Sequence, residues 1–250
     1  MAFIKFLGTA GARFVMIEQL RASGGIWISS GSDNLILDPG PGSLVRALES
    51  RPKLDPTKLT GVILSHKHLD HSADVNVMIE AMTAGGHTKR GAVFTPGDAL
   101  GPEPVIQKYL RNFPERLETL EESKEYQVGE ISFTTVRMLH PVETYGLNFR
   151  IKNRTVSFIT DTAYFSEIPD RFPGEILVIN VVLTERKPEV FHLSFPEIAD
   201  ILAYLKPQKV VLTHFGRRVL IANPQEIADQ LSQKFGLEIL AATDGMVIEV

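Results

Sequence analysis

Residues 61 to 75 read GVILSHKHLDHSADV, a short apolar run that ends in three histidines and an aspartate. Titratable side chains at the end of a buried strand cost stability unless a partner satisfies them. If the apolar run is a buried strand, His66 and His68 leave it on the same side, because extended residues two apart face one way. Asp70 and His71 then lie in the turn that follows and point back toward the same space. The segment therefore predicts a metal site.

Four further apolar stretches end directly in a titratable residue. In chain order these residues are Asp38 after NLIL, His140 after ISFTTVRML, Asp161 after TVSFIT and His214 after KVVLT. Sites in open α/β sheets form outside the carboxyl ends of strands, so we expect these side chains to face one pocket. Two cations about 3.5 to 4 Å apart could share a bridging carboxylate and a bridging water there. The number of ligands suits two metal ions.

Short β-branched runs alternate with helical patterns along the chain, which is typical of an α/β protein. Strands are predicted over residues 3–7, 26–29, 34–37, 61–64, 92–95, 131–139, 147–152, 155–160, 176–180, 209–213 and 246–250. Helices are predicted over residues 42–50, 72–84, 103–112, 194–205 and 224–235. The charged stretch over residues 114–127 is the most loop-like segment and divides the chain into two comparable halves.

The composition limits the classes of protein to which the chain can belong. At 250 residues, with 44% hydrophobic and 22% charged residues, the sequence can bury a large core as a soluble globular protein. A formal net charge of −4 without a long run of one sign disfavours a nucleic-acid partner. The absence of cysteine excludes disulfides and thiolate metal ligands. No apolar run has the length of a signal or membrane segment, so we expect a cytoplasmic protein with no membrane partner.

The HKHLDH segment matches the pattern H-x-H-x-D-H and resembles the metallo-β-lactamase superfamily. The resemblance extends over most of the chain, from LILDPGPGS through His140, FITDT and LTHFG to the closing TDGMVIEV. It implies a single domain over residues 1–250 with a four-layer αββα sandwich of two similar halves. Within the superfamily, the chain is most similar to the branch of ribonuclease Z and the cyclic-phosphate phosphodiesterases.

The resemblance also implies a role for each residue at a strand end. His66, His68 and His140 would bind one metal ion, Asp70, His71 and His214 would bind the other, and Asp161 would bridge the two. Asp38 would support the histidine loop through hydrogen bonds rather than bind metal. Imidazole and carboxylate ligands without thiolate suit zinc best, with manganese, iron or cobalt as alternatives.

A pair of metal ions would indicate the class of reaction but would leave the substrate open. A water held between two cations has its pKa lowered toward neutrality, and the resulting hydroxide can attack an electrophile. Asp70 and Asp161 would orient this nucleophile, so Asp70 is expected to be catalytic as well as metal-binding. Members of the superfamily hydrolyse β-lactams, thioesters, lactones and phosphodiesters, and some carry out redox chemistry, so the fold alone does not name the substrate.

His192 precedes the last ligand, His214, by 22 residues. This arrangement resembles the H-S-T segment of ribonuclease Z and related phosphodiesterases, in which the histidine contacts phosphate and helps to protonate the leaving oxygen. His192 is therefore the expected general acid, because an alkoxide leaving group needs a proton near neutral pH. The segment departs from the family pattern at Leu193 and Phe195, which keeps a structural or surface role for His192 open.

The leading hypothesis is a hydrolase with a dinuclear metal site that acts on a small or cyclic phosphodiester. A lactonase or thioesterase with the same metals is the main alternative, and a binding module with a structural metal site is a third. A ribonuclease Z-like nuclease fits less well, since the 20 residues between His140 and Asp161 are too few for the tRNA-gripping arm of that enzyme. The expected partner is a small-molecule ester, and the resemblance leaves a homodimer open.

Other polar groups give weaker signals. Arg217 and Arg218 follow the last ligand and could bind an anionic substrate, although an Arg pair is more often a solvated surface. Lys67 lies inside the histidine motif and could contact phosphate. His87 lies in a glycine-rich connection and is assigned no role.

Overall fold

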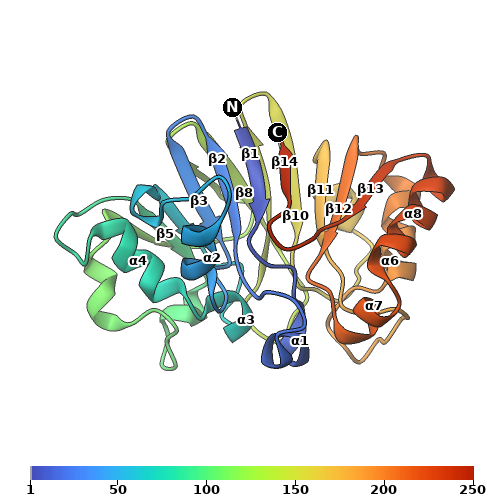
Figure 1. Ribbon diagram of the computed structural model, residues 1–250, viewed down its shortest axis with the longest axis horizontal. Coiled ribbons are helices and arrows are strands. Elements are labelled where there is room, and N and C mark those ends of the chain that lie inside the picture. The colour runs from blue at the N-terminus through green and yellow to red at the C-terminus, as the bar shows by residue number, and fades with distance from the viewer. Residues whose placement is uncertain (1) are drawn as a thin grey trace.

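The chain folds into two sheets of seven strands each, and the computed structural model describes residues 2–250 (Figure 1). The first sheet contains β1 (Ala2–Phe6), β2 (Ile26–Ser30), β3 (Asp33–Leu37), β4 (Gly61–Ile63), β5 (Ala92–Thr95), β6 (Arg116–Thr119) and β14 (Val247–Glu249). The second contains β7 (Glu125–Val128), β8 (Ile131–Arg137), β9 (Tyr145–Ile151), β10 (Arg154–Ile159), β11 (Ile176–Asn180), β12 (Lys209–Thr213) and β13 (Glu238–Ala241). The strand orders are β14-β1-β2-β3-β4-β5-β6 and β13-β12-β11-β10-β9-β8-β7.

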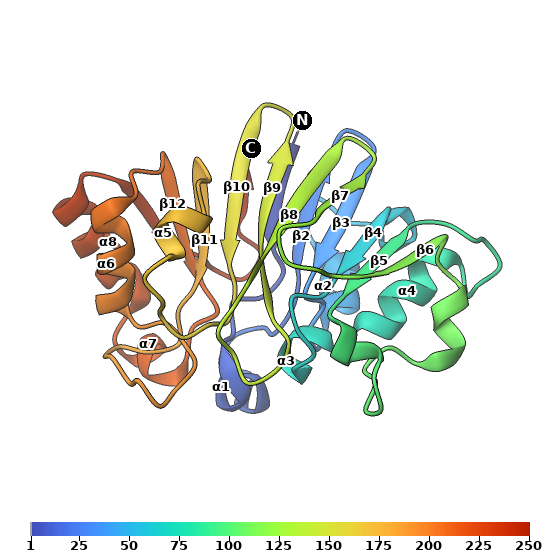
Figure 2. The ribbon, with the colours of Figure 1, turned by 180° about the vertical axis from the view of Figure 1, so that it is seen from behind.

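Helices cover the outer faces of both sheets. The α-helices are α1 (Ala12–Glu18), α2 (Ser43–Glu49), α3 (Leu69–Ser72), α4 (Val75–Thr83), α5 (Ile168–Arg171), α6 (Phe195–Tyr204), α7 (Arg217–Ile221) and α8 (Pro224–Phe235), and short 3-10 helices span Pro56–Lys58, Gly97–Leu100 and Lys108–Asn112. Helices α2 and α4 flank the first sheet, whereas α6 and α8 flank the second on the opposite side of the molecule (Figures 1 and 2). Between residues 2 and 250, no helix is both long and apolar enough to cross a bilayer.

Three apolar clusters separate these layers. Phe94, Phe133 and Phe158 belong to the cluster between the two sheets, which draws residues from both of them. A second cluster joins the outer face of the first sheet to α4, and a third joins the outer face of the second sheet to α6 and α8. The predicted four-layer αββα sandwich of two similar halves is confirmed.

Helix α6 shows how the sequence specifies an outer layer. Ile198, Ile201 and Leu202 are buried at helical spacing and face the second sheet. Ser194 begins the helix with a capping box, since its side chain and backbone N–H both donate to the carboxylate of Glu197. The segment that carries His192 therefore enters a firmly anchored helix.

Parallel strands bring the loops of both halves to one edge of the molecule. β3 and β4 run parallel in the first sheet, and β10, β11 and β12 run parallel in the second. The carboxyl ends of these strands open toward the edge where α1, α3 and α7 lie, at the bottom of Figure 1. This edge is where parallel α/β sheets form their sites.

The structure corrects three details of the predicted secondary structure. Residues 114–127 are not a loop throughout: they contain β6 and the start of β7, two edge strands that expose polar side chains, and exposed polar residues are also typical of loops. The helix predicted over 103–112 is reduced to the 3-10 helix Lys108–Asn112, because Pro104 disfavours helical backbone at Glu103. The helix predicted over 72–84 is broken at Ala73 and Asp74, between α3 and α4, where the Asp74 carboxylate accepts a hydrogen bond from the Leu44 N–H.

Candidate metal centre

The residues predicted from strand ends come together at the lower edge of the two sheets. In the first half of the chain, His66 and His68 follow β4, and Asp70 and His71 lie on α3. In the second half, His140 follows β8, Asp161 follows β10, His192 follows β11 and His214 follows β12. Residues from both halves of the chain thus contribute to one cluster, because the two sheets present their carboxyl ends to the same edge.

The first ligand group consists of His66, His68 and His140. One nitrogen from each of these rings lies within 4.8 Å of the others. His68 Nδ1 is 3.2 Å from His140 Nε2, and the His66 ring centre is 4.8 Å from that of His68 and 5.0 Å from that of His140. The three imidazoles therefore face a common point, as predicted for one metal ion.

The second group consists of Asp70, His71 and His214. Oδ2 of Asp70 lies 3.8 Å from His71 Nε2 and 3.7 Å from His214 Nε2. One ligand atom from each of the three residues lies within 4.8 Å of the others, which makes this set a second candidate for holding a cation.

Asp161 lies between the two groups. Its Oδ2 is 3.8 Å from His66 Nε2 and 3.4 Å from His71 Nε2, and its Oδ1 is 3.4 Å from His214 Nε2. Asn180, at the end of β11, donates a hydrogen bond to Oδ1 at 2.8 Å and fixes the orientation of the carboxylate. One carboxylate thus contacts both groups, which is the arrangement that a bridging ligand requires.

Asp38 orients the histidines without entering either group. Its Oδ2 accepts from His71 Nδ1 at 3.0 Å and from the hydroxyl of Ser65 at 2.6 Å, and its Oδ1 accepts from the Ser65 N–H at 2.6 Å. Because the Ser65 hydroxyl donates to Asp38, it accepts from His66 Nδ1, 3.0 Å away. Both Nε2 atoms are thereby directed into the cluster, the supporting role expected for Asp38.

The segment before α6 orients a third ring. The carbonyl of Phe191 can only accept, so His140 Nδ1 donates to it at 3.0 Å and His140 Nε2 is left free to bind a cation. The next residue, His192, places its ring 5.3 Å from that of His140 and its Nδ1 3.7 Å from Asp161 Oδ2. His192 therefore lies beside the cluster rather than on a distant surface.

The cluster fits divalent cations on two observations. His66 Nε2 and His71 Nε2 are buried and have no hydrogen-bond partner. A buried polar atom without a partner lowers the stability of the fold, and a bound cation would remove this cost. The contacts of 3.4 Å that Asp161 makes with His71 and His214 are long for hydrogen bonds. They match the separation of about 3.3 to 3.4 Å expected between two ligands that are each about 2.0 to 2.1 Å from a tetrahedral zinc ion.

The electrostatics of the cluster also suit a cation. Burial lowers the pKa of His66 well below its ordinary value and lowers the pKa of His140 to about 4, so these rings are neutral and can donate a lone pair. Burial also opposes protonation of His71, but Asp161, Asp70 and Asp38 outweigh it and raise the His71 pKa well above its ordinary value. The negative charge of these three carboxylates, which favours a proton on His71, would also favour the binding of a metal cation.

Two glycines allow loops to approach the ligand-bearing backbone closely. A Cβ atom at Gly40 would lie 2.0 Å from the Asp70 carbonyl oxygen, and one at Gly11 would lie 2.0 Å from the carbonyl oxygen of His214. His214 itself has a φ of 59°, a left-handed conformation that costs energy in a residue with a side chain. The backbone around the site is therefore held in place by its neighbours.

The weaker candidates have other contacts. Lys67 Nζ lies 3.6 Å from the Asp98 carboxylate, and the guanidinium groups of Arg217 and Arg218 lie near Glu18 and Glu185 at exposed positions. Exposed His87 lies in the connection after α4. None of these side chains belongs to either ligand group.

Sequence reasoning missed Ser65 and Asn180 as parts of the site. Asn180 is the last residue of β11 and Ser65 lies two residues beyond the end of β4, so both stand near a strand end, as the ligands do. A serine or an asparagine at such a position is common in ordinary turns, so this signal alone could not have identified them.

Comparison with known proteins identifies the family of the chain. Residues 33–215 match the sequence model of the beta-lactamase superfamily domain. The chain is 30% identical over 258 aligned residues to an uncharacterised protein of Methanocaldococcus jannaschii, with 99% of this chain and 94% of that protein covered. It is 25% identical over 237 residues to the probable metallo-hydrolase YhfI of Bacillus subtilis, with 91% and 93% covered.

Solved structures share the fold over the whole chain. The crystal structure of YhfI superposes with a TM-score of 0.78 at 21% identity, covering 100% of this chain and 99% of that one. A diphosphatase from the PhnP family superposes with a TM-score of 0.73 at 17% identity, covering 100% and 97%. The chain therefore belongs to the metallo-β-lactamase superfamily, which confirms the resemblance drawn from its histidine motif.

Proposed function

We propose that the chain is a phosphodiesterase that uses two divalent metal ions and acts on a small or cyclic phosphodiester. The observation that supports this proposal most directly is the position of His192, 3.7 Å from Asp161 and beside His140. His192 belongs to neither ligand group and so remains available to transfer a proton. Hydrolysis of an alkyl ester needs such a donor, because an alkoxide is a poor leaving group near neutral pH.

The two ligand groups would hold one ion each. His66, His68 and His140 would bind the first ion, Asp70, His71 and His214 would bind the second, and Asp161 would be shared. Zinc is the favoured metal, since four-coordinate sites of imidazole and carboxylate suit it, with manganese or iron as alternatives. When bound, the ions would lower the pKa of water and stabilise negative charge on the substrate oxygens.

The chain's own residues would orient the reaction. Asp70 and Asp161 would accept hydrogen bonds from the attacking water, and Asn180 holds Asp161 in the required orientation. His192 would donate a proton to the leaving oxygen. Burial lowers the pKa of the His192 ring, while the negative charge of a bound phosphodiester favours its protonated form.

A small substrate is favoured over a polynucleotide. The 20 residues between His140 and Asp161 form little more than β9 and β10, so no arm extends from this part of the site. The net charge of −4 does not favour the binding of a long phosphate backbone.

A panel of substrates tests the proposal. Protein purified from metal-replete cells is assayed with bis(p-nitrophenyl) phosphate, 2′,3′-cyclic nucleotides, a lactone and a thioester, with added zinc or manganese. We expect turnover of the phosphodiesters, loss of this activity after chelation, and recovery when the metal is returned. Turnover of the lactone or thioester without hydrolysis of any phosphodiester would contradict the proposal and favour a carbon-ester hydrolase.

A further inference from the structure

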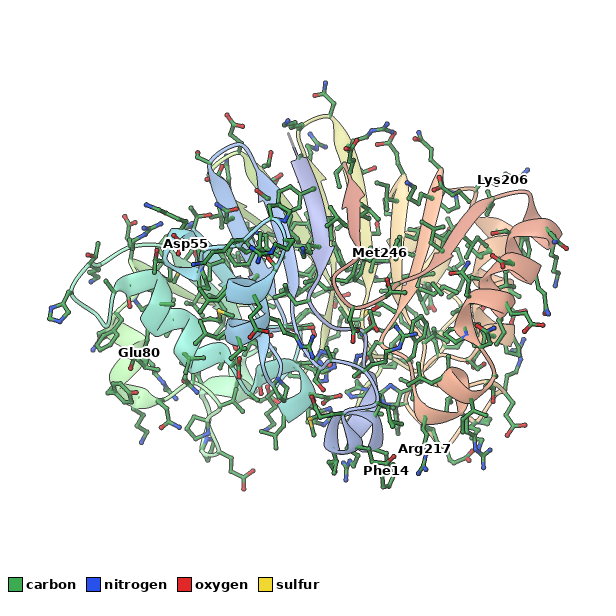
Figure 3. The ribbon with its side chains drawn as sticks, viewed as in Figure 1. Phe14, Asp55, Glu80, Lys206, Arg217 and Met246 are labelled. Atoms are coloured by element: carbon green, nitrogen blue, oxygen red, sulfur yellow. The ribbon has the colours of Figure 1, made fainter. Side chains whose placement is uncertain are left out.

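We infer that a cavity of about 380 Å³ on the outer face of the first sheet binds a small molecule through its phosphate group. The cavity lies between β1, the end of α2 and the loop before β14. Figure 3 labels Met246 of that loop in the middle of the view, above Phe14 and Arg217 at the edge that carries the metal centre. The volume lies in the range of ligand pockets, roughly 300 to 1,000 Å³. Among residues 2–250, those that line the cavity are separate from the metal ligands, so the inference does not depend on the proposed function.

The alternation of side chains along β1 directs Lys5 toward this cavity. Residues two apart on a strand face one way, so Lys5 shares its face with Leu7, which packs in the outer apolar cluster. Phe6 faces the other way and packs between the two sheets. Lys5 also stands directly opposite Trp27 of β2, which belongs to the same outer cluster as Leu7. The Lys5 side chain therefore extends outward from the sheet.

Hydrogen bonds hold both walls of the cavity in place. In the loop before β14, the Gly245 N–H donates to the Phe6 carbonyl at 2.7 Å, and the Met246 carbonyl accepts from the Phe6 N–H at 2.9 Å. In the turn after α2, the Ser50 hydroxyl donates to the Pro52 carbonyl at 2.6 Å. The cavity is thus formed by anchored segments, as a binding site requires.

The ammonium group of Lys5 is buried without a counter-charge. Lys5 is 3% exposed, and its Nζ donates to the Arg51 carbonyl at 2.9 Å. Among residues 2–250, no carboxylate oxygen lies within 4.0 Å of this Nζ. A buried charge without a partner is costly, and burial accordingly lowers the pKa of Lys5. An anion in the cavity would supply the missing charge and accept further hydrogen bonds from the ammonium group.

Two guanidinium groups add to this positive charge. Arg46 on α2 and Arg51 beyond it line the cavity, and neither has a carboxylate oxygen within 4.0 Å of its side-chain nitrogens in the described part of the chain. Glu49 and Asp244 also line the cavity, but Glu49 is exposed, and the carboxylate of Asp244 already accepts three hydrogen bonds. Three cations thus face two carboxylates, one of which is already engaged.

This set of donors favours phosphate over carboxylate. A phosphate monoester carries about 1.5 to 2 negative charges near neutral pH and has three terminal oxygens, so it can pair with one ammonium and two guanidinium groups together. A carboxylate carries one charge on two oxygens. The planar fork of a guanidinium group also matches phosphate oxygens in pairs. The rest of the cavity would hold the organic part of the molecule.

Trp27 provides a probe beside the cavity. It is the single tryptophan of the chain, and side chains directly opposite on neighbouring strands, as Trp27 and Lys5 are, have Cβ atoms about 4.5 to 5.5 Å apart. The fluorescence of the metal-loaded protein is measured during titration with inorganic phosphate, adenosine monophosphate, adenosine or acetate at constant ionic strength. We expect a saturable change with the two phosphates, none with adenosine, and at least about tenfold weaker binding of acetate.

Three variants assign the binding to the cavity. Arg51→Gln removes a cation at an exposed position and should leave the fold intact, and Lys5→Met removes the buried ammonium group but keeps an apolar chain. Each should weaken the binding of phosphate at least about tenfold. Lys53→Gln makes the same change of net charge two residues from Arg51, outside the cavity wall, and should weaken it by less than about twofold. All three variants retain the metal ligands, so phosphate bound at the metal centre contributes equally to each protein.

Isothermal titration calorimetry repeats the comparison with a signal that does not depend on Trp27. Equal affinity for phosphate in the wild type and in Arg51→Gln by both methods, or no saturable binding by either, would overturn the inference. An equal loss in Lys53→Gln would indicate a diffuse effect of charge and would also overturn it. Adenosine or acetate that binds as tightly as adenosine monophosphate would contradict the recognition of phosphate. Binding that is lost in Arg51→Gln would uphold the inference even if the protein hydrolyses no phosphodiester.

Discussion

The carboxylate of Asp38 lies 3.0 Å from Nδ1 of His71, and through this hydrogen bond it directs His71 Nε2 toward the metal centre. The same carboxylate accepts from Ser65, whose hydroxyl in turn contacts Nδ1 of His66. One residue outside the ligand groups therefore orients a histidine from each of them. Such supporting hydrogen bonds fix the tautomer of a ligand and increase its basicity.

Asp38→Asn should therefore weaken metal binding without unfolding the protein. We expect metal affinity to fall by about 10- to 100-fold, as is typical when a supporting carboxylate is removed. Competition with a chromogenic chelator measures the affinity, and Asp170→Asn, at an exposed position in α5, is the matched control. Unchanged affinity in Asp38→Asn would show that the hydrogen bond to His71 does not support the site.

Gly40→Ala should displace the ligand segment. The new Cβ would lie 2.0 Å from the Asp70 carbonyl oxygen, so the backbone at Asp70 must move or the fold must loosen. We expect a loss of about 1 to 3 kcal/mol in the free energy of unfolding, measured by denaturant titration, together with weaker metal binding. Gly97→Ala is the control, because its Cβ would approach only one carboxylate oxygen of Glu143, at the ordinary contact distance of 3.4 Å. Similar behaviour of the two variants would argue against a close approach at Gly40.

His192→Ala should affect substrates according to their leaving group. Loss of a general acid costs about 10²- to 10⁴-fold in turnover when the leaving group needs a proton. A dialkyl phosphodiester or a cyclic nucleotide should show this loss, whereas a p-nitrophenyl ester should lose far less, because p-nitrophenolate leaves without protonation. Equal losses on both substrates would remove the general-acid assignment. His87→Ala, at an exposed histidine remote from the site, should change neither rate.

Removal of metal should lower the thermal stability of the protein. Without a cation, the buried Nε2 atoms of His66 and His71 have no hydrogen-bond partner, and Asp161 loses the charge that it would bridge. A ligand present at 100 times its dissociation constant stabilises a fold by about 2.7 kcal/mol, so a clear fall in Tm is expected after chelation. Thermal unfolding before chelation, after chelation and after return of zinc measures this effect. An identical Tm in all three states would contradict a metal site coupled to the fold.

The ligands could be predicted from the sequence because they share one position relative to the strands. His140, Asp161 and His214 each follow an apolar run, and parallel strands in two facing sheets bring such positions to one edge. Ser65 and Asn180 could not be predicted in the same way, since their importance depends on which carboxylate lies opposite them. That information exists only once the chain has folded.

Several elements escaped prediction for local physical reasons. Helix α1 (Ala12–Glu18) spans seven residues and its N-cap residue, Gly11, has no side chain to cap it, so it lacks the usual signal of a helix start. The strands β6 and β7 lie at sheet edges and expose polar side chains, among them Arg116, Glu125 and Gln127, which made residues 114–127 resemble a loop. The cavity lined by residues of α1, of the connection between β11 and α6, and of α7 could not be predicted either, because only the tertiary fold brings these three segments together.

Metal content tests the central claim most directly. Wild-type protein is purified from metal-replete cells and dialysed without chelator, and its metal content is measured by inductively coupled plasma mass spectrometry. It should contain about two transition-metal ions per chain. Asp161→Asn, which removes the carboxylate between His71 and His214, should reduce this to about one or fewer. A wild-type protein that binds no transition metal, even when zinc or manganese is supplied, would contradict the proposed metal centre.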